Sequence, residues 1–261
     1  MSAPLHITSR DNPLLAQLRA LCRDGAAYRH TGKVWIEGEH LCAAALARGV
    51  VVDHAVLSEA AWQLPQLRAL TRSASKIAIV PEALMKPLSA LPSAAPLGFV
   101  LTLPAASAIE PRAHTVVLDR LQDAGNVGSI LRSAAALGVT QVLALTGTAT
   151  LWSPKVLRAG MGAHFALRLV EGLDASALDV LDLPWLATSS HAGADLHHTP
   201  LPRPAAWIFG HEGQGVAAAL MARCALTLRI AQPGGEESLN VAAAAAICLY
   251  ESFRQSALDE R

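Results

Sequence analysis

The C-terminal part of the chain repeats one arrangement twice: a short apolar run, a polar loop rich in glycine, and an alanine-rich stretch. The apolar runs at residues 206–209 and 226–230 have the length of buried strands. The loops that follow read GHEGQG at 210–215 and QPGGEESLN at 232–240, and each leads into a helical pattern. Alternating strands and helices predict a parallel α/β sheet, in which both loops lie at the carboxyl ends of strands, where ligands bind.

Two interpretations of these loops stay open. They can be ordinary turns, with Ser238 or Asn240 capping the final helix. They can also form a binding site, because glycines let the main chain approach a ligand without interference from Cβ atoms. The occurrence of Glu212, Ser238 and Asn240 in one pair of loops favours the binding site.

Length and composition exclude several classes of protein. The 261 residues suffice for one large domain or two smaller ones with a real core. No uncharged apolar run reaches the ~20 residues that span a bilayer, and the first residues lack the basic-then-apolar order of a secretion signal. We therefore expect a cytoplasmic protein without membrane contact. The formal net charge is zero, so any contact with a polyanion must come from local patches.

Neither the cysteines nor the histidines predict a metal site. The four cysteines form no CxxC pair, and buried, reduced thiols are the expected state. His191, His197 and His198 cluster in a loop-like segment, but no cysteine or carboxylate spacing supports a metal there. We therefore expect no metal.

The first hundred residues predict a separate, small α/β unit. Strand-like and helical runs alternate from Pro13 to Thr102. Six prolines occur from Pro81 to Pro111, and this change in composition places a domain boundary within residues 104–113. The early basic residues can contact RNA phosphates or form a solvated helix face; they are Arg10, Arg19, Arg23, Arg29 and Lys33.

The second unit opens with a βαβ pattern. Residues 115–119 and 141–145 are expected strands, joined by a glycine-bearing loop and a helix that begins at Val127 or Ser129. The GNVG tetrapeptide in that loop is a weak signal for nucleotide phosphate, because a full GxGxxG is absent and no acidic residue closes the next strand. A Rossmann-type dehydrogenase is therefore disfavoured. The final helix, at 240–253, is apolar on nearly every face, which predicts burial, naturally at a subunit interface.

Three separated motifs resemble, in order and spacing, the signature motifs of the SpoU/TrmH family of RNA ribose 2′-O-methyltransferases. They are DAGNVG at 123–128 with Arg132 downstream, FGHEGQG at 209–215 and ESLNV at 237–241. The segment from SPK at 153–155 to GAHF at 162–165 resembles the family too. SRDNP at 9–13 and IEG at 36–38 are similar to its RNA-binding module. The resemblance covers nearly the whole chain.

This resemblance implies a fold, a cofactor and a set of site residues. The fold is α/β: a small N-terminal RNA-binding domain at 1–104 and a parallel-sheet methyltransferase domain of SPOUT type at 113–261, tied in a trefoil knot. A homodimer through the C-terminal domain is implied, as is S-adenosylmethionine, held by main chain around Thr188, Gly210, Ile230 and Leu239. The positions associated with activity are Asn126, Arg132, Glu212, Ser238 and Asn240. The family often has proline where this chain has Ala124 and Ala231, which concerns loop geometry more than catalysis.

The implied reaction moves a methyl group from a sulfonium to a ribose hydroxyl of structured RNA, which requires alignment and removal of a proton. Because a guanidinium is a poor base, we expect Arg132 to bind the phosphate beside the target ribose. Asn126 then positions the ribose or Arg132, Glu212 orients Arg132 or loop N–H groups, and Ser238 and Asn240 hold the loop and substrate. Family analogy favours rRNA over tRNA. An RNA-binding or assembly factor without chemistry is the alternative.

Overall fold

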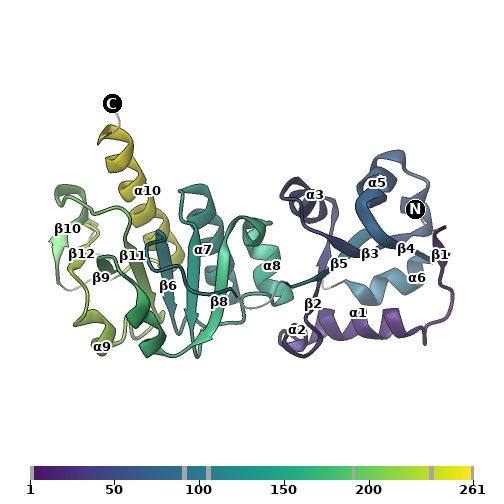
Figure 1. Cartoon of the computed structure of the whole chain (residues 1–261), viewed down its shortest axis with the longest axis horizontal. Coiled ribbons are helices and arrows are strands. Elements are labelled where there is room, and N and C mark those ends of the chain that lie inside the picture. Colours follow the sequence, from purple (N-terminus) through teal and green to yellow (C-terminus); the bar gives the residue numbers. More distant parts are fainter. Residues whose placement is uncertain (1–2, 90–92, 104–106, 190–191, 235–237, 260–261) are drawn as a thin grey trace. The chain divides into compact units, whose positions relative to one another are not determined.

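The computed structural model describes residues 3–89, 93–103, 107–189, 192–234 and 238–259, with side chains described up to residue 256. The chain divides into two compact units. One is Met1–Ala105 with Trp152–Phe165, and the other is Ala106–Leu151 with Ala166–Arg261. Each unit is built on one β-sheet with helices packed against it (Figure 1). The predicted α/β class is confirmed.

The first unit contains a five-stranded sheet in the order β1-β4-β3-β5-β2. The neighbours β1, β4 and β3 run parallel, whereas β5 runs antiparallel to both β3 and β2. The strands are β1 (Leu5–His6), β2 (Lys33–Glu37), β3 (Val52–Ser58), β4 (Ala74–Val80) and β5 (Leu97–Thr102). The α-helices are α1 (Pro13–Arg23), α2 (Ala27–Thr31), α3 (Glu39–Ala47), α4 (Glu59–Trp62), α5 (Pro65–Leu70), α6 (Glu82–Met85) and α8 (Pro154–Gly160).

Both faces of this sheet are covered, as the alternation of side chains along β2 shows. Val34 and Ile36 belong to one buried cluster, while Trp35 between them belongs to another, because successive side chains of a strand point to opposite faces. Helix α1 contributes its buried leucines to the cluster around Trp35. Leu157 of α8 joins the opposite cluster. The segment Trp152–Phe165 therefore completes a core that is otherwise built from the first hundred residues.

The second unit contains a seven-stranded sheet in the order β10-β12-β9-β11-β6-β7-β8, parallel throughout. The parallel sheet predicted from the alternating pattern is thus confirmed. Its strands are β6 (Thr115–Asp119), β7 (Gln141–Leu145), β8 (Arg168–Leu173), β9 (Trp185–Thr188), β10 (Ala194–Asp195), β11 (Ala206–Gly210) and β12 (Leu226–Arg229). Its α-helices are α7 (Ala124–Ala136), α9 (Ala218–Met221) and α10 (Val241–Asp259).

The final helix is buried on one side only. Helix α10 packs beside α7 and against β11 (Figure 1), and Trp207 Nε1 on β11 donates a hydrogen bond to Ser252 Oγ at 3.1 Å. Its other side exposes Ile247, Tyr250 and Phe253, with 56% of Tyr250 accessible. Within one protomer the sheet and α7 cover only one side of the helix, and burial of its other side at a subunit interface stays a prediction.

Of the helices in the described part of the chain, none combines the length and the apolar character needed to cross a membrane.

Candidate active site

Three of the residues predicted to hold the cofactor lie at one edge of the seven-stranded sheet. Thr188 ends β9, Gly210 ends β11, and Ile230 directly follows β12. Because β12, β9 and β11 are adjacent and parallel, these positions share the edge formed by the carboxyl ends of the strands. Leu239, the fourth position, is exposed and comes two residues before α10.

The loop after β11 folds back tightly on the end of its own strand. The Gly215 N–H donates to the His211 carbonyl at 2.8 Å, and the Gly213 N–H donates to His211 Nδ1 at 3.0 Å. A Cβ atom at Gly210 would lie 2.1 Å from both the Gly215 carbonyl carbon and the Val216 nitrogen. Only glycine fits there, so main-chain atoms rather than a side chain form the wall of the candidate cofactor site at this position. Such a wall suits a ligand that is recognised through peptide groups.

Helix α7 begins earlier than its sequence predicts. Residues up to 128 were expected to form a glycine-bearing loop, but α7 starts at Ala124, because Asp123 Oδ1 caps it by accepting the Asn126 N–H at 2.7 Å. Asn126 consequently lies in the first turn of the helix. Ala124 is the first helical residue, a position that favours proline.

Three distant motifs meet through the side-chain amide of Asn126. Its Nδ2 donates to Glu212 Oε1 at 3.3 Å, and its Oδ1 accepts a hydrogen bond from Asn240 Nδ2 at 3.0 Å. Asn240 Oδ1 in turn accepts from the N–H groups of Ala242 and Ala243 at the start of α10. The amide of Asn126 is therefore fixed in orientation between an acceptor and a donor that lie 86 and 114 residues further along the chain.

The carboxylate of Glu212 sits at the amino-terminal end of α7. It accepts the N–H groups of Gln122 at 3.3 Å and Asp123 at 3.2 Å, where the helix dipole favours a negative charge. Partial burial alone would raise the pKa of Glu212, but hydrogen bonds from its own backbone, from Asn126 and from the two N–H groups outweigh it and lower that pKa. Glu212 is thus ionised at neutral pH and is better suited to orienting neighbours than to taking a proton.

The structure does not bring all the predicted catalytic residues into this network. Arg132 is exposed on α7, six residues and roughly 9 Å along the axis from Asn126. Ser238 is exposed two residues before Asn240. Among the described residues, neither side chain has a hydrogen bond or ion pair with Asn126, Glu212 or Asn240. Their roles stay predictions.

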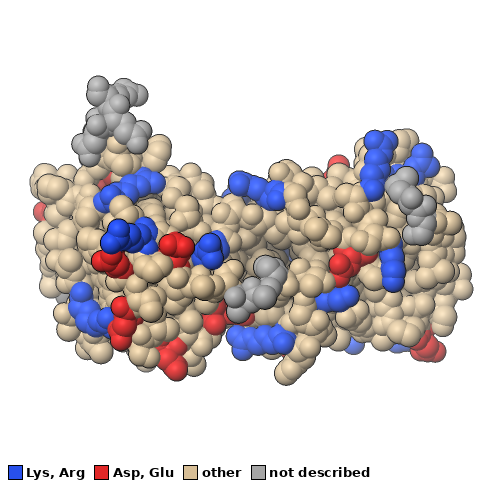
Figure 2. Space-filling view, in the orientation of Figure 1, with Lys and Arg blue, Asp and Glu red and all other residues tan. Residues whose placement is uncertain are grey.

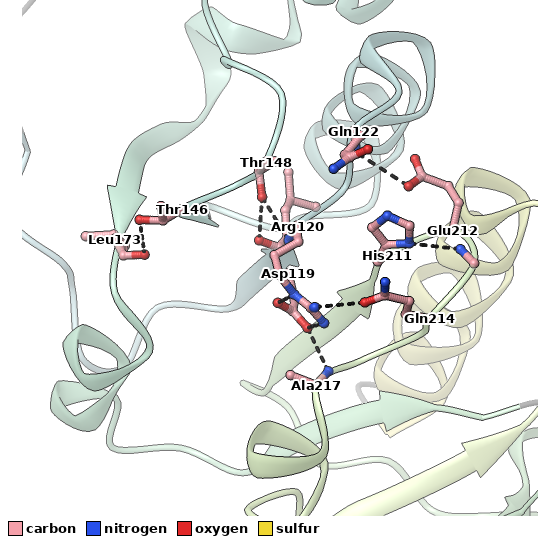
Figure 3. Close-up of polar contacts among 12 residues, drawn as sticks. Asp119, Arg120, Gln122, Thr146, Thr148, Leu173, His211, Glu212, Gln214 and Ala217 are labelled. Carbon is pink, nitrogen blue, oxygen red and sulfur yellow. Dashed lines mark hydrogen bonds and ion pairs between the residues drawn. The ribbon is translucent and has the colours of Figure 1, made fainter.

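An ion pair beside Gly210, between buried Asp119 and partly exposed Arg120, was not foreseen from the sequence. Asp119 ends β6 opposite Gly210 and is only 2% exposed. It pairs with Arg120 at 2.8 Å and accepts the Ala217 N–H at 2.7 Å, while Arg120 Nη1 donates to Gln214 Oε1 at 3.1 Å (Figure 3). The pair therefore holds Gln214 within the tight turn and Ala217 just after it. A charged dipeptide directly after the apolar run of β6 was the available signal.

Arg120 adopts a backbone conformation that non-glycine residues rarely take, with φ at 60°. Its N–H donates to Thr148 Oγ1 at 3.1 Å, and the Thr148 hydroxyl donates to the Leu118 carbonyl at 3.0 Å (Figure 3). These bonds hold the turn after β6 in place, and a strained residue that its surroundings fix in this way is typical of a functional site.

Comparison with known proteins shows to which family this chain belongs. Residues 113–250 match the sequence profile of the SpoU rRNA Methylase family. The chain belongs to the SpoU rRNA methylase family. A member from Synechocystis sp., named as an uncharacterized tRNA/rRNA methyltransferase, is 35% identical over 95% of this chain and 93% of its own. The 23S rRNA (guanosine(2553)-2′-O)-methyltransferase RlmP of Bacillus subtilis is 38% identical over 52% of this chain and 56% of its own.

Solved SpoU structures share the whole fold. The SpoU methyltransferase AviRb from Streptomyces viridochromogenes, in complex with the cofactor AdoMet, superposes with a TM-score of 0.85 at 25% identity, over 94% of this chain and 98% of its own. A crystal structure of an RNA 2′-O ribose methyltransferase gives a TM-score of 0.81 at 32% identity, over 97% and 100% of the two chains. The predicted family is confirmed, as is the predicted α/β fold with a parallel sheet, and the trefoil knot stays a prediction.

The basic residues near the amino terminus of this SpoU protein are partly engaged within the protein. Lys33 pairs with Asp53 at 3.2 Å, and Arg19 Nη2 donates to the Arg10 carbonyl at 3.0 Å. On the face drawn in Figure 2, acidic and basic side chains are interspersed rather than separated. Contact of these residues with RNA stays a prediction.

One group of side chains has the composition of a metal site. Asp195, His197 and His198 place ligand atoms within 4.8 Å of one another. However, Asp195 Oδ1 accepts hydrogen bonds from Arg229 Nε at 3.1 Å and Nη2 at 2.8 Å. Because a guanidinium already neutralises this carboxylate and repels a cation, the group is a surface ion pair beside two histidines. His191, the third histidine of the sequence cluster, lies outside the described residues.

Proposed function

We propose that this SpoU protein transfers a methyl group from S-adenosylmethionine to a ribose 2′-hydroxyl of structured RNA, with ribosomal RNA as the substrate. The observation that carries the proposal is the amide of Asn126, which joins Glu212 of the second motif to Asn240 of the third. Relatives whose names specify 23S rRNA 2′-O-methylation support the substrate class.

The residues at the edge of the seven-stranded sheet fit the methyl donor. Thr188, Gly210, Ile230 and Leu239 would hold it, largely through main-chain groups, because Gly210 leaves no space for a side chain. When bound, S-adenosylmethionine supplies an electrophilic methyl group on a sulfonium. The ion pair of Asp119 and Arg120 positions the loop that carries Glu212.

The polar residues of the site have separate roles in positioning the ribose, the loops and the phosphate. Asn126, with its amide fixed by two partners, positions the target ribose. Glu212 stays ionised and orders the start of α7. Arg132, whose guanidinium has no partner among the described residues, binds the phosphate beside that ribose and stabilises charge that builds on the hydroxyl oxygen. Ser238 and Asn240 hold the third loop against the substrate.

The same proposal covers assembly and location. Residues 1–104, with Trp152–Phe165 packed in the same unit, form the RNA-binding domain, and the rest of residues 113–261 forms the methyltransferase domain with a trefoil knot. Two copies associate through α10, because Ile247, Tyr250 and Phe253 form an apolar surface that isolated proteins rarely expose. The protein acts in the cytoplasm, where RNA is available and where its free cysteines stay reduced.

Transfer of tritiated methyl groups to purified rRNA and tRNA tests the reaction and its substrate together. We expect label in rRNA and a 2′-O-methylated ribonucleoside after digestion. Label in tRNA alone would show that tRNA, and not rRNA, is the substrate. If the protein binds rRNA but transfers no methyl group, whether or not it binds S-adenosylmethionine, it is an assembly factor that keeps only the fold. Mapping 2′-O-methyl positions in cells with and without the protein identifies the nucleotide.

A further inference from the structure

One side chain of the candidate active site has no role in the reaction as proposed so far. His211 directly follows Gly210, where main-chain atoms form the wall of the cofactor site, and directly precedes Glu212, which holds the amide of Asn126. The imidazole is partly exposed. His211 therefore lies between the place of the methyl donor and the place of the ribose.

The loop after β11 fixes both the backbone and the ring of His211. Its carbonyl accepts the Gly215 N–H at 2.8 Å, and its Nδ1 accepts the Gly213 N–H at 3.0 Å. Both partners are main-chain groups of the same tight loop. The ring is held before any ligand arrives, so a contact made by it costs little further conformational freedom.

The bond to Gly213 also fixes the tautomer of His211. A ring nitrogen that accepts an N–H must present a lone pair, and a neutral imidazole has only one proton, which is therefore on Nε2. A proton on Nδ1 would put two donors face to face and break the bond. In this conformation of the loop, Nε2 of the neutral ring is a donor and cannot take the proton of the ribose hydroxyl.

The donor of His211 is free to meet a ligand. No described residue has a hydrogen bond with Nε2. In Figure 3 the bonded nitrogen of the ring faces the loop, and the other nitrogen is turned towards Gln122 and the carboxylate of Glu212. That carboxylate accepts the Gln122 N–H and Nδ2 of Asn126. The free N–H of His211 is thus directed towards the network that joins the three motifs.

We propose that His211 is a substrate-binding residue, whose Nε2–H donates to a ribose hydroxyl oxygen of the target nucleotide. Glu212 is ionised, so its charge repels a phosphate and favours a neutral acceptor at this place. Ribose hydroxyl oxygens are such acceptors, and Asn126 of the same network is the proposed ribose-positioning residue. The inference rests on the proposed function for the identity of the substrate and adds a residue to that site.

Two substitutions separate the two nitrogens of the ring. His211→Asn keeps an acceptor at the same number of bonds from the backbone as Nδ1, so the bond from Gly213 is retained and only the outer donor is lost. His211→Gln places an amide N–H₂ near the position of Nε2 and lacks the inner acceptor. One variant therefore removes the contact with RNA, and the other removes the bond within the loop.

Steady-state methyl transfer to rRNA should divide the two variants. In His211→Asn we expect the KM for rRNA to rise roughly 2- to 10-fold, the effect of one neutral hydrogen bond, with kcat, the melting temperature and the affinity for S-adenosylmethionine near wild-type values. In His211→Gln we expect a KM near the wild-type value, a lower melting temperature and weaker binding of S-adenosylmethionine. An unchanged KM in His211→Asn, or the same losses in both variants, would overturn the proposal.

The ring can also be observed directly by NMR in full-length protein labelled with 15N at histidine. The signal that is missing in His211→Asn belongs to His211, and above about pH 8, where imidazoles are neutral, it should show the proton on Nε2. In the complex with S-adenosylhomocysteine, guanosine 5′-monophosphate should shift this signal, and its 2′,3′-dideoxy analogue, which lacks both hydroxyls, should not. A proton on Nδ1, or equal shifts by the two nucleotides, would contradict the assignment.

The affinity of the S-adenosylhomocysteine complex for rRNA distinguishes this inference from the proposed reaction. If wild-type protein transfers no methyl group but still binds rRNA about 2- to 10-fold more tightly than His211→Asn does, the contact of His211 is supported and the reaction is contradicted. Transfer by both proteins with equal KM and equal affinity for rRNA contradicts the contact of His211 alone.

Discussion

The close approach of Gly210 to Gly215 makes Gly210→Ala a sharp perturbation of the cofactor site. The added Cβ would meet backbone atoms at 2.1 Å, whereas ordinary contact begins at 3.4 Å, so the loop must move by at least the difference of 1.3 Å. No flexible side chain can absorb this shift, since the atoms it meets belong to the Gly215 carbonyl and the Val216 nitrogen. We expect the strain to destabilise the folded state by about 1–3 kcal/mol.

The displaced loop carries Glu212, so we expect weaker binding of S-adenosylmethionine and slower methyl transfer. A misplacement of about 1 Å at a reacting site costs on the order of 100-fold in rate, and we expect affinity for S-adenosylmethionine to fall about 10- to 100-fold. Calorimetry measures the affinity, and single-turnover transfer of tritiated methyl measures the rate.

The same loop offers a matched control. A Cβ at Gly213 would meet only the His211 ring, at 3.8 Å and 3.9 Å, which is ordinary contact. Gly213→Ala should therefore bind the donor and transfer methyl at nearly the wild-type level. Wild-type affinity in Gly210→Ala, or equal losses in both variants, would refute the argument that main chain forms this wall.

Three further predictions concern single side chains. Arg132→Ala should abolish methyl transfer and spare donor binding; equal loss of both by calorimetry would reject its role at the phosphate. Asp119→Asn should destabilise the protein by roughly 1–3 kcal/mol and weaken binding of the methyl donor, since it removes the charge that holds Arg120 and the Ala217 N–H. An unchanged melting temperature would contradict this prediction. Burial and Arg203 lower the pKa of His114 from 6.5 to about 4. Because the unfolded chain then binds a proton that the folded chain does not, stability should fall by roughly 3 kcal/mol as the pH drops from 6.5 to 4, and His114→Gln should lose that dependence in urea titrations at each pH.

Local signals in the sequence were sufficient where local chemistry decides the structure. The apolar runs that became β6, β7 and β11 occupy the predicted places, and Asn240 caps α10 as its spacing indicates. The order of the motifs was enough to identify the family. These features depend on neighbours within a few residues or on a pattern of residue types.

Contacts between distant segments account for what the sequence did not reveal. Glycines at 125 and 128 predict a loop, yet the cap from Asp123 and the Glu212 carboxylate stabilise a helix there. Nothing within Trp152–Phe165 indicates that it packs in the first unit, because Leu157 reaches a core formed by residues more than fifty positions away. The role of Asp119 depends on Ala217, 98 residues later.

A crystal structure with S-adenosylhomocysteine bound tests the central claim most directly. We predict that the ligand contacts main-chain N–H or carbonyl groups at Thr188, Gly210, Ile230 and Leu239, with the amide of Asn126 still joined to Glu212 and Asn240. A ligand at the opposite edge of the sheet, or one held by side chains away from these strand ends, would contradict it.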